Sequence, residues 1–347
     1  MKCSNYDACI YYLINGSKML IVAVYVDDLL IFSNDKILKD DLKSCLQKQF
    51  KMKDFGEAKC VLGMQITRDR KSETISINQS QYIQKVLDRF DMADCNSVSI
   101  PADPNQKLTA EMSPKNQSDR ESMENMPYQE AIGSLLFAAQ VSRPDIQFAV
   151  GAVSRLKNNP GVAHWLAVKR IMRYLKGTID MKLTYSKNGN EVVQGYCDSD
   201  WASDSIDRRS TTGYVFKLQG GAISWASKKQ PTVALSTTES EYMAMSLATQ
   251  EAIWWQGLCQ ELLGEKKCLT IINCDNKGAI QLAEKTAFSP RTKHIDVRHH
   301  FLREKVNDKV VKFVYVNTNE MLADSLTKPV TAEKHKFCSK GVNLVMN

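Results

Sequence analysis

Apolar runs and amphipathic stretches alternate along the first hundred residues. Two apolar runs, at 19–24 and 29–32, flank the acidic tetrapeptide Tyr25-Val26-Asp27-Asp28. Apolar, β-branched runs interrupted by Asp predict a strand, a tight turn and a second strand. The spacing of the apolar residues further predicts a helix at 36–50, a hairpin from 60–66 and 74–77, and a helix at 79–90.

The rest of the chain separates into a polar, a helical and an alternating segment. Residues 99–127 are rich in Pro, Asn, Ser, Met and charged residues, which predicts a linker or an exposed loop. Residues 128–187 follow helical spacing and include a predicted helix at about 163–176. From residue 192 onward, strand-like runs at 192–197, 269–274 and 310–316 alternate with helical patterns at 238–263 and 277–284.

Length, charge and cysteine content narrow the class of protein. With 347 residues the chain has room for two or three domains, and its net charge of +7 suits a polyanionic partner. Its apolar stretches are too short to span a bilayer, so we expect no membrane association and no secretion signal. Cys45, Cys197 and Cys274 lie within apolar patterns, which predicts buried free thiols.

The acidic turn is the first candidate site. Adjacent carboxylates repel each other and destabilise a fold unless a cation neutralises them, and a divalent metal carrying a nucleoside triphosphate meets this need. A solvated acidic turn is the alternative. Flanked by two strands, the tetrapeptide resembles the polymerase hairpin of reverse transcriptases, in the form typical of copia-type retrotransposon polyproteins. The resemblance implies that Asp27 and Asp28 are catalytic and bind metal.

The polymerase portion is expected to be incomplete. In the reverse transcriptase family a third Asp comes from a strand many tens of residues before the hairpin, whereas only 24 residues precede Tyr25. The single acidic residue among them, Asp7, matches a non-catalytic position of the family. We therefore expect residues 1–100 to be a partial reverse transcriptase palm and thumb with no polymerase activity of their own.

A second set of carboxylates lies in four different predicted elements. Asp198 and Asp275 end strand-like runs, Glu241 lies early in a predicted helix, and Asp324 lies in a helix after the last strand. Strand ends and first helical turns are places where side chains from distant segments converge on one edge of a sheet. Carboxylate oxygens are the ligands that two magnesium ions require for hydrolysis of a phosphodiester.

The strings around these four residues resemble the ribonuclease H domains of copia-type elements. The matching strings are Gly195-Tyr196-Cys197-Asp198-Ser199-Asp200-Trp201-Ala202, Thr238-Glu239-Ser240-Glu241-Tyr242-Met243-Ala244, Cys274-Asp275-Asn276-Lys277-Gly278-Ala279 and Leu322-Ala323-Asp324-Ser325-Leu326-Thr327-Lys328. The resemblance implies that Asp198, Glu241, Asp275 and Asp324 hold two Mg²⁺ ions, or Mn²⁺ in their place. It also implies that the domain hydrolyses the RNA strand of an RNA–DNA hybrid.

The resemblance covers essentially the whole chain, as a C-terminal fragment of a copia-type Pol polyprotein. The implied fold class is α/β: an α+β palm remnant (1–100), a linker and helical connection region (101–189), a mixed-sheet ribonuclease H-like α/β domain (190–330) and a C-terminal tail (331–347). The implied partners are an RNA–DNA hybrid and the missing N-terminal part of the polyprotein. A cytoplasmic virus-like particle and the nucleus are the expected locations.

Two ligand assignments have close competitors. Ser236 followed by Glu239 is a capping-box pattern, which assigns the Glu239 side chain to backbone N–H groups and leaves Glu241 as the ligand. Asp198 and Asp200 share one face of a strand. The family pattern uses the first of them, and Asp200 is expected to support the site.

Basic residues outside the carboxylate set are candidates for contact with nucleic acid. In the predicted helix at 163–176, Lys169, Arg173 and Lys176 lie close together opposite the apolar side, where a solvated basic face is an equal alternative. Arg291, Lys293 and Arg298 belong to a basic segment beside the carboxylate set and are expected to approach phosphates.

Two further functions stay open at this point. The chain is either a catalytic fragment or a non-catalytic relic, including a co-opted protein that binds nucleic acid. It is also a candidate for half of an active reverse transcriptase that an N-terminal segment completes.

Overall fold

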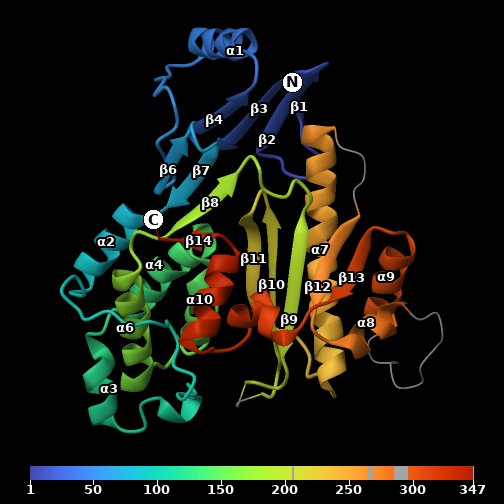
Figure 1. Ribbon diagram of the computed structural model, residues 1–347. Helices are drawn as coiled ribbons and strands as arrows, with labels where there is room; N and C mark the ends of the chain where they lie inside the picture. The colour runs from blue at the N-terminus through green and yellow to red at the C-terminus, as the bar shows by residue number, and fades with distance from the viewer. Residues whose placement is uncertain (205–206, 265–268, 285–295, 347) are drawn as a thin grey trace.

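Three sheets and a bundle of helices make up the described part of the protein. The computed structural model describes residues 1–204, 207–264, 269–284 and 296–346 (Figure 1). One sheet has the order β1-β2-β3-β4, the second β11-β10-β9-β12-β13 and the third β14-β8-β7-β6-β5. Within the described residues, no helix is both long enough and apolar enough to cross a membrane.

The second sheet forms the predicted mixed-sheet domain. Its first three strands, β9 (Gln194–Asp200), β10 (Thr211–Leu218) and β11 (Gly221–Lys229), are antiparallel neighbours. The remaining two, β12 (Thr270–Cys274) and β13 (Val311–Tyr315), run parallel to β9. This mixture of pairings, with helices packed against the sheet, confirms the expected α/β class.

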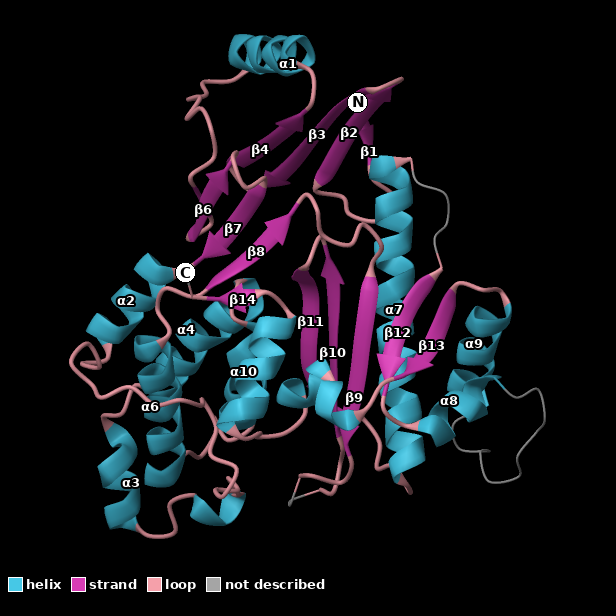
Figure 2. Ribbon diagram, in the orientation of Figure 1, coloured by secondary structure: helices cyan, strands magenta, loops and turns pink. Residues whose placement is uncertain are grey.

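Both faces of this sheet are buried at β10, whose successive side chains point to opposite sides. On one side, Phe216 of β10 packs with Tyr242 and Met245 of α7 (Thr237–Leu263). On the other, Val215 of the same strand packs with Leu322 and Leu344 near the C-terminus. Figure 2 shows α7 beside the strands, with α8 (Lys277–Glu284) and α9 (Asp296–Asn307) beyond β13.

The C-terminal segment is therefore not a tail. Residues 331–347 include α10 (Ala332–Gly341) and β14 (Leu344–Val345), and β14 pairs with β8 (Lys182–Ser186). Leu344 is 1% exposed because it closes the second face of the sheet. The strand β8 also corrects the helical expectation for 128–187. A five-residue strand at the end of a helical segment gives too short an alternation to stand out.

The predicted N-terminal hairpins are confirmed in two separate sheets. β3 (Lys18–Tyr25) pairs with β4 (Asp28–Ser33), beside β1 (Lys2–Cys3) and β2 (Ile10–Asn15). β6 (Met64–Asp69) pairs with β7 (Thr74–Asn78), beside β5 (Cys60–Val61). The first sheet leaves several large apolar side chains exposed: Tyr11, Ile14, Tyr25, Val26 and Phe32.

The helix after the first hairpin lies beside β4 and contributes no fully buried residue. None of the residues of α1 (Lys36–Gln49) is buried, although Leu38, Leu42 and Leu46 follow helical spacing. Cys45 is exposed on this helix, so its expected burial is wrong, whereas Cys197 and Cys274 are buried as expected. Figure 1 shows α1 at the top of the molecule, apart from the other helices.

The connection region packs as a helical bundle with its own core. Side chains of α2 (Ser80–Arg89), α4 (Tyr128–Val141), α5 (Gln147–Ser154) and α6 (Val162–Gly177) contribute to one buried cluster, which includes Leu87, Leu135 and Met172. The polar segment 99–127 contains a short helix, α3 (Gln117–Glu124), and only Met123 of that helix is buried. The other predicted helices, at 238–263 and 277–284, are confirmed as α7 and α8.

The N-terminal segment is fastened to α7 by Glu261. Its Oε1 accepts hydrogen bonds from the backbone N–H and the side-chain amide of Asn5, at 3.1 and 2.7 Å, and Ser4 donates to Oε2. Trp254 of the same helix donates to the Tyr6 carbonyl at 3.0 Å. These contacts hold a sheet that buries little apolar area of its own.

Replacing Glu261 with alanine is expected to loosen residues 1–33 selectively. Hydrogen bonds to a charged group contribute about 1 kcal/mol at a partly exposed site, which is roughly a fivefold change in the population of the opened segment. Limited trypsin digestion followed by mass spectrometry measures cleavage within residues 1–33. The exposed residue Glu191, replaced with alanine, is the control. Equal cleavage rates in both variants would contradict the assignment.

Candidate active site

The four predicted carboxylates converge at one edge of the mixed sheet. Asp198 lies in β9, Glu241 in the second turn of α7, Asp275 directly after β12 and Asp324 in the 3-10 helix η5 (Leu322–Leu326). η5 packs against β9 and β10, and α7 packs against β9 and β12, so the four segments meet. Asp198, Glu241 and Asp324 are buried, with exposed fractions of 2%, 6% and 2%.

Asp198 is a buried carboxylate in a crowded acidic environment. The Thr327 hydroxyl donates to its Oδ2, and the Lys328 ammonium lies 3.9 Å from the same oxygen. Burial raises the pKa of Asp198 to about 7, with a further contribution from Asp324 and against the opposing effect of Lys328. A buried carboxylate with a raised pKa beside other acidic groups is typical of functional sites.

Glu241 presents an oxygen with no hydrogen-bond partner. Its Oε1 accepts from the Ser199 backbone N–H at 3.2 Å, whereas its buried Oε2 has no partner among the described residues. Burial, and then repulsion from Asp198, raises the pKa of Glu241 well above its ordinary value. A buried carboxylate oxygen without a partner is costly, and a bound metal ion would satisfy it.

The competing residue, Glu239, serves the helix end. The Ser236 hydroxyl accepts from the Glu239 N–H at 3.2 Å, and the Glu239 carboxylate accepts from the Leu235 N–H at 2.8 Å. Its side chain is therefore engaged with backbone donors at the start of α7, as the capping pattern predicted. The structure places Glu241, and not Glu239, beside Asp198.

Asp275 completes the cluster with a thiol beside it. Ligand atoms of Glu241, Cys274 and Asp275 all lie within 4.8 Å of one another, a separation that suits a bound metal ion. The Thr318 hydroxyl donates to Asp275 Oδ2 at 2.7 Å and orients the carboxylate. The residues present thus fit divalent cations, because they combine hard oxygen donors, burial and an unpartnered Oε2.

Two lysines enter the same site, and the sequence did not single them out. Lys328 Nζ lies 2.6 Å from Asp324 Oδ1, and Lys334 Nζ lies 2.9 Å from Asp324 Oδ2. The spacing of Asp324 and Lys328, four residues apart, was the available signal. Asp200, expected to support the site, is half-buried, and burial raises its pKa.

The polymerase hairpin lies far from this cluster. Asp27 lies in the turn between β3 and β4, and Asp28 is the first residue of β4. Both are exposed, and Val26 in the turn has a φ of 51° and is 82% exposed. A positive φ is unfavourable for a β-branched residue, and such strain is typical of functional turns. Figure 1 places the first sheet at the top of the molecule and the end of β9 at the bottom. In the described residues, no third metal-ligating side chain groups with this pair.

The candidate nucleic-acid contacts on α6 are half-buried on the helical bundle. Arg173 donates from Nε to the Asn96 carbonyl at 2.7 Å, and Lys169 lies 5.7 Å from the centre of the Trp165 ring. Lys176 lies in the last turn of the helix. Arg291 and Lys293 lie outside the described residues, and α9 carries Arg298, whose side chain also lies outside them.

Comparison with known proteins shows the family to which the chain belongs. Residues 1–104 match the reverse transcriptase (RNA-dependent DNA polymerase) family. The Retrovirus-related Pol polyprotein from transposon TNT 1-94 of Nicotiana tabacum is 43% identical over 343 residues, which are 98% of this chain and 26% of that protein. The putative transposon Ty5-1 protein of Saccharomyces cerevisiae is 30% identical over 243 residues, which are 70% of this chain and 77% of that protein.

The chain thus spans about a quarter of the length of the tobacco relative. Among solved structures, LC11-RNase H1, isolated from compost by a metagenomic approach, aligns with 40% of this chain and 93% of its own. That alignment has a TM-score of 0.31 and 14% sequence identity.

Proposed function

The chain belongs to the copia-type retrotransposon Pol polyproteins and includes a ribonuclease H-like domain, and we propose that this domain cleaves the RNA strand of RNA–DNA hybrids. The observation that carries the proposal is the convergence of Asp198, Glu241, Asp275 and Asp324 from four separate elements, with Glu241 Oε2 buried and unpartnered among the described residues. A structural role alone does not explain why a fold would concentrate these charges at a cost.

Magnesium is the cation that we propose for the site, with manganese as a substitute. Glu241 and Asp275 would hold one ion, and Asp198 and Asp324 the other. Such ions supply activation of the attacking water and stabilisation of the leaving oxygen. Cys274 adds a soft donor that magnesium does not prefer, so we assign it no ligand role.

The chain's own residues orient this site. Thr318 fixes the Asp275 carboxylate, and the Ser199 N–H and the Thr327 hydroxyl hold Glu241 and Asp198. Burial at the sheet edge keeps competing water away from these oxygens. We propose that the hybrid is recognised through its backbone shape and its 2′-hydroxyls, with weak sequence preference and strong salt dependence.

The polymerase hairpin has a separate role in this proposal. Asp27 and Asp28 would contribute two of the metal-binding carboxylates of a reverse transcriptase if another segment completed the palm. The exposed apolar residues of the first sheet, including Tyr11 and Phe32, support an additional partner surface there.

Replacing Asp324 with asparagine is expected to lower hybrid cleavage at least 100-fold, about 2.7 kcal/mol, and to leave hybrid binding within twofold. Asparagine keeps the shape of the side chain but removes the charge that holds a cation. The assay uses a labelled RNA–DNA hybrid with Mg²⁺, with single-stranded RNA as the substrate control. Asp180→Asn, at an exposed position, is the control variant.

Two outcomes decide between the proposed activity and its rivals. Hybrid-specific cleavage that Asp324→Asn removes and Asp180→Asn keeps supports the ribonuclease. Hybrid binding without cleavage by the folded wild-type protein would favour a non-catalytic nucleic-acid-binding protein.

A further inference from the structure

An ammonium group already lies between two of the proposed metal ligands. Lys328 Nζ is 2.6 Å from Asp324 Oδ1 and 3.9 Å from Asp198 Oδ2. Both carboxylates are 3% exposed at the side chain, whereas the lysine side chain is 34% exposed. A buried pair of like charges is thus neutralised by a cation that reaches in from the surface.

The second lysine of the site is held in a different way. Lys334 Nζ is 2.9 Å from Asp324 Oδ2 and also donates to the carbonyls of Thr318 and Asn319, at 2.6 and 2.9 Å. Three acceptors fix this ammonium group in place. Since its two carbonyl acceptors do not depend on the carboxylate, Lys334 is expected to stay where it is when the charge of the cluster changes.

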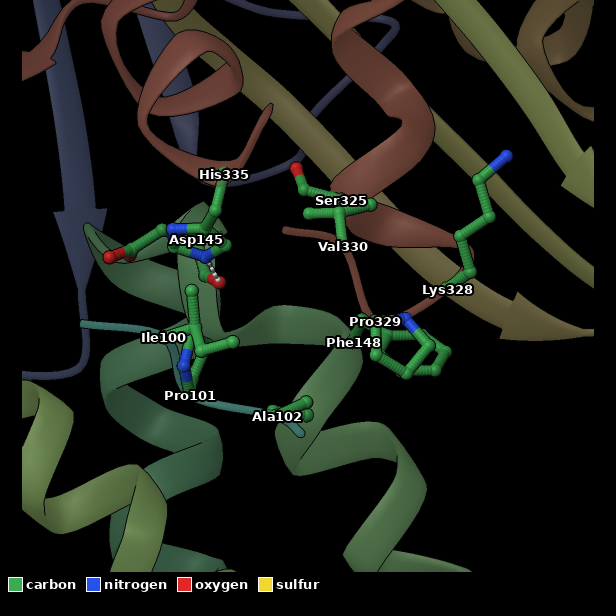
Figure 3. A pocket seen from close by; sticks show the side chains of 11 residues that line it. Ile100, Pro101, Ala102, Asp145, Phe148, Ser325, Lys328, Pro329, Val330 and His335 are labelled. Carbon is green, nitrogen blue, oxygen red and sulfur yellow. Dashed lines mark hydrogen bonds between the residues drawn. The ribbon is translucent and has the colours of Figure 1, made fainter. Parts of the chain in front are cut away.

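The side chain of Lys328 moves more freely than that of Lys334. Its carbon stem lines a small crevice between the ribonuclease H-like domain and the connection region, together with Phe148, Pro329 and Pro101. Figure 3 shows its amino end pointing away from the hydrogen-bonded Asp145 and His335 on the other side of this crevice. A lysine is a compact point charge on a flexible stem, so its amino end turns outward without a change in the backbone.

We propose that Lys328 is an exchangeable counter-ion, which a divalent cation displaces from the oxygens of Asp198 and Asp324. The inference rests on the proposed function, because it takes these two carboxylates as metal ligands. One oxygen cannot contact an ammonium group and a divalent cation on the same side. Loading of the cation therefore turns Lys328 toward solvent, where its charge is available to a phosphate of the substrate.

If a divalent cation displaces Lys328, we expect this lysine to weaken binding of the cation. Lys328→Met removes the charge and keeps much of the stem, and we expect it to tighten Mn²⁺ binding about tenfold, which equals about 1.4 kcal/mol. Lys328→Arg keeps the charge and is expected to bind Mn²⁺ no more tightly than the wild type. Lys71→Met, at an exposed position in the turn between β6 and β7, is the control.

The test measures free Mn²⁺ by electron paramagnetic resonance during titration of the full chain, without substrate. Asp324→Asn identifies which of the bound Mn²⁺ belongs to this site. Thermal unfolding with and without Mn²⁺ checks that each variant is folded and gives a second readout, since a tighter cation raises the melting temperature more.

Two outcomes support the displacement of Lys328. In the first, Lys328→Met alone binds Mn²⁺ tenfold more tightly, and in the second, Lys328→Met binds Mn²⁺ although the wild type binds none. An unchanged or weaker affinity in Lys328→Met overturns it and leaves the proposed ribonuclease intact. If neither protein binds Mn²⁺, the exchange is overturned, and hybrid cleavage by the same preparations decides the proposed function separately.

Discussion

Asp198→Asn is expected to raise the free energy of unfolding of the cation-free protein by roughly 4 kcal/mol at pH 8. Burial is the main reason that the pKa of Asp198 rises from its ordinary value of 3.8 to about 7. Each tenfold change in proton affinity corresponds to about 1.4 kcal/mol, and the buried position leaves little screening by solvent. Asparagine removes the charge and keeps an oxygen that accepts from Thr327.

The direction of the pH dependence follows from the raised pKa. The folded protein keeps the Asp198 proton at pH values where the unfolded chain has already released it. The stability that this proton provides is complete below about pH 4 and is lost as the pH rises through about 7. The wild type is therefore expected to lose stability over this range relative to Asp198→Asn.

Urea unfolding in a chelator, followed by tryptophan fluorescence at several pH values, measures the difference between the two proteins. Asp180→Asn is again the matched control, because its carboxylate is exposed and its replacement is expected to leave the wild-type curve unchanged. If Asp198→Asn and the wild type give parallel curves from pH 4 to 8, the carboxylate does not carry the strain assigned to it. Added Mg²⁺ is expected to stabilise the wild type more than the variant, which keeps only the ion of Glu241 and Asp275.

Local patterns were sufficient to predict the elements that carry the four carboxylates. Asp198 and Asp275 follow apolar runs, and the cap at Ser236 gives the start of the helix that carries Glu241. Gly264, with a φ of 66°, ends the same helix where the sequence predicted it. Such signals depend only on neighbouring residues, so a single sequence is sufficient to recognise them.

Contacts between distant segments left no comparable signal. The pairing of β14 with β8 joins residues about 160 positions apart, and two residues of strand carry no recognisable period. In the sequence, Lys328 and Lys334 are indistinguishable from ordinary surface charges. Only the fold places Lys328 beside Asp198. The exposed Cys45 is the opposite case, in which the sequence has the pattern but the structure lacks the contact. An amphipathic pattern indicates a buried face only when another element covers it.

Arg143 is the center of a buried network that the sequence did not indicate. Its guanidinium donates two hydrogen bonds to Asp145, at 3.0 and 2.7 Å, and two to Thr178, at 3.0 and 2.6 Å. Tyr174 donates to the same carboxylate at 2.6 Å, and His335 of α10 contacts the Asp145 carbonyl at 3.0 Å. The network thus joins the connection region to the segment that follows Asp324.

Arg143→Met is expected to lower the free energy of unfolding by about 3–5 kcal/mol, because it leaves the Asp145 charge buried without its partner. The two side chains are 1% and 0% exposed, so solvent cannot replace the guanidinium. The double variant Arg143→Met with Asp145→Leu removes both charges and is expected to recover more than half of the loss. Urea unfolding of the wild type, the single variant and the double variant measures this recovery. A double variant as unstable as Arg143→Met would show that the hydrogen bonds to Thr178 and Tyr174, rather than the unpaired charge, account for the effect.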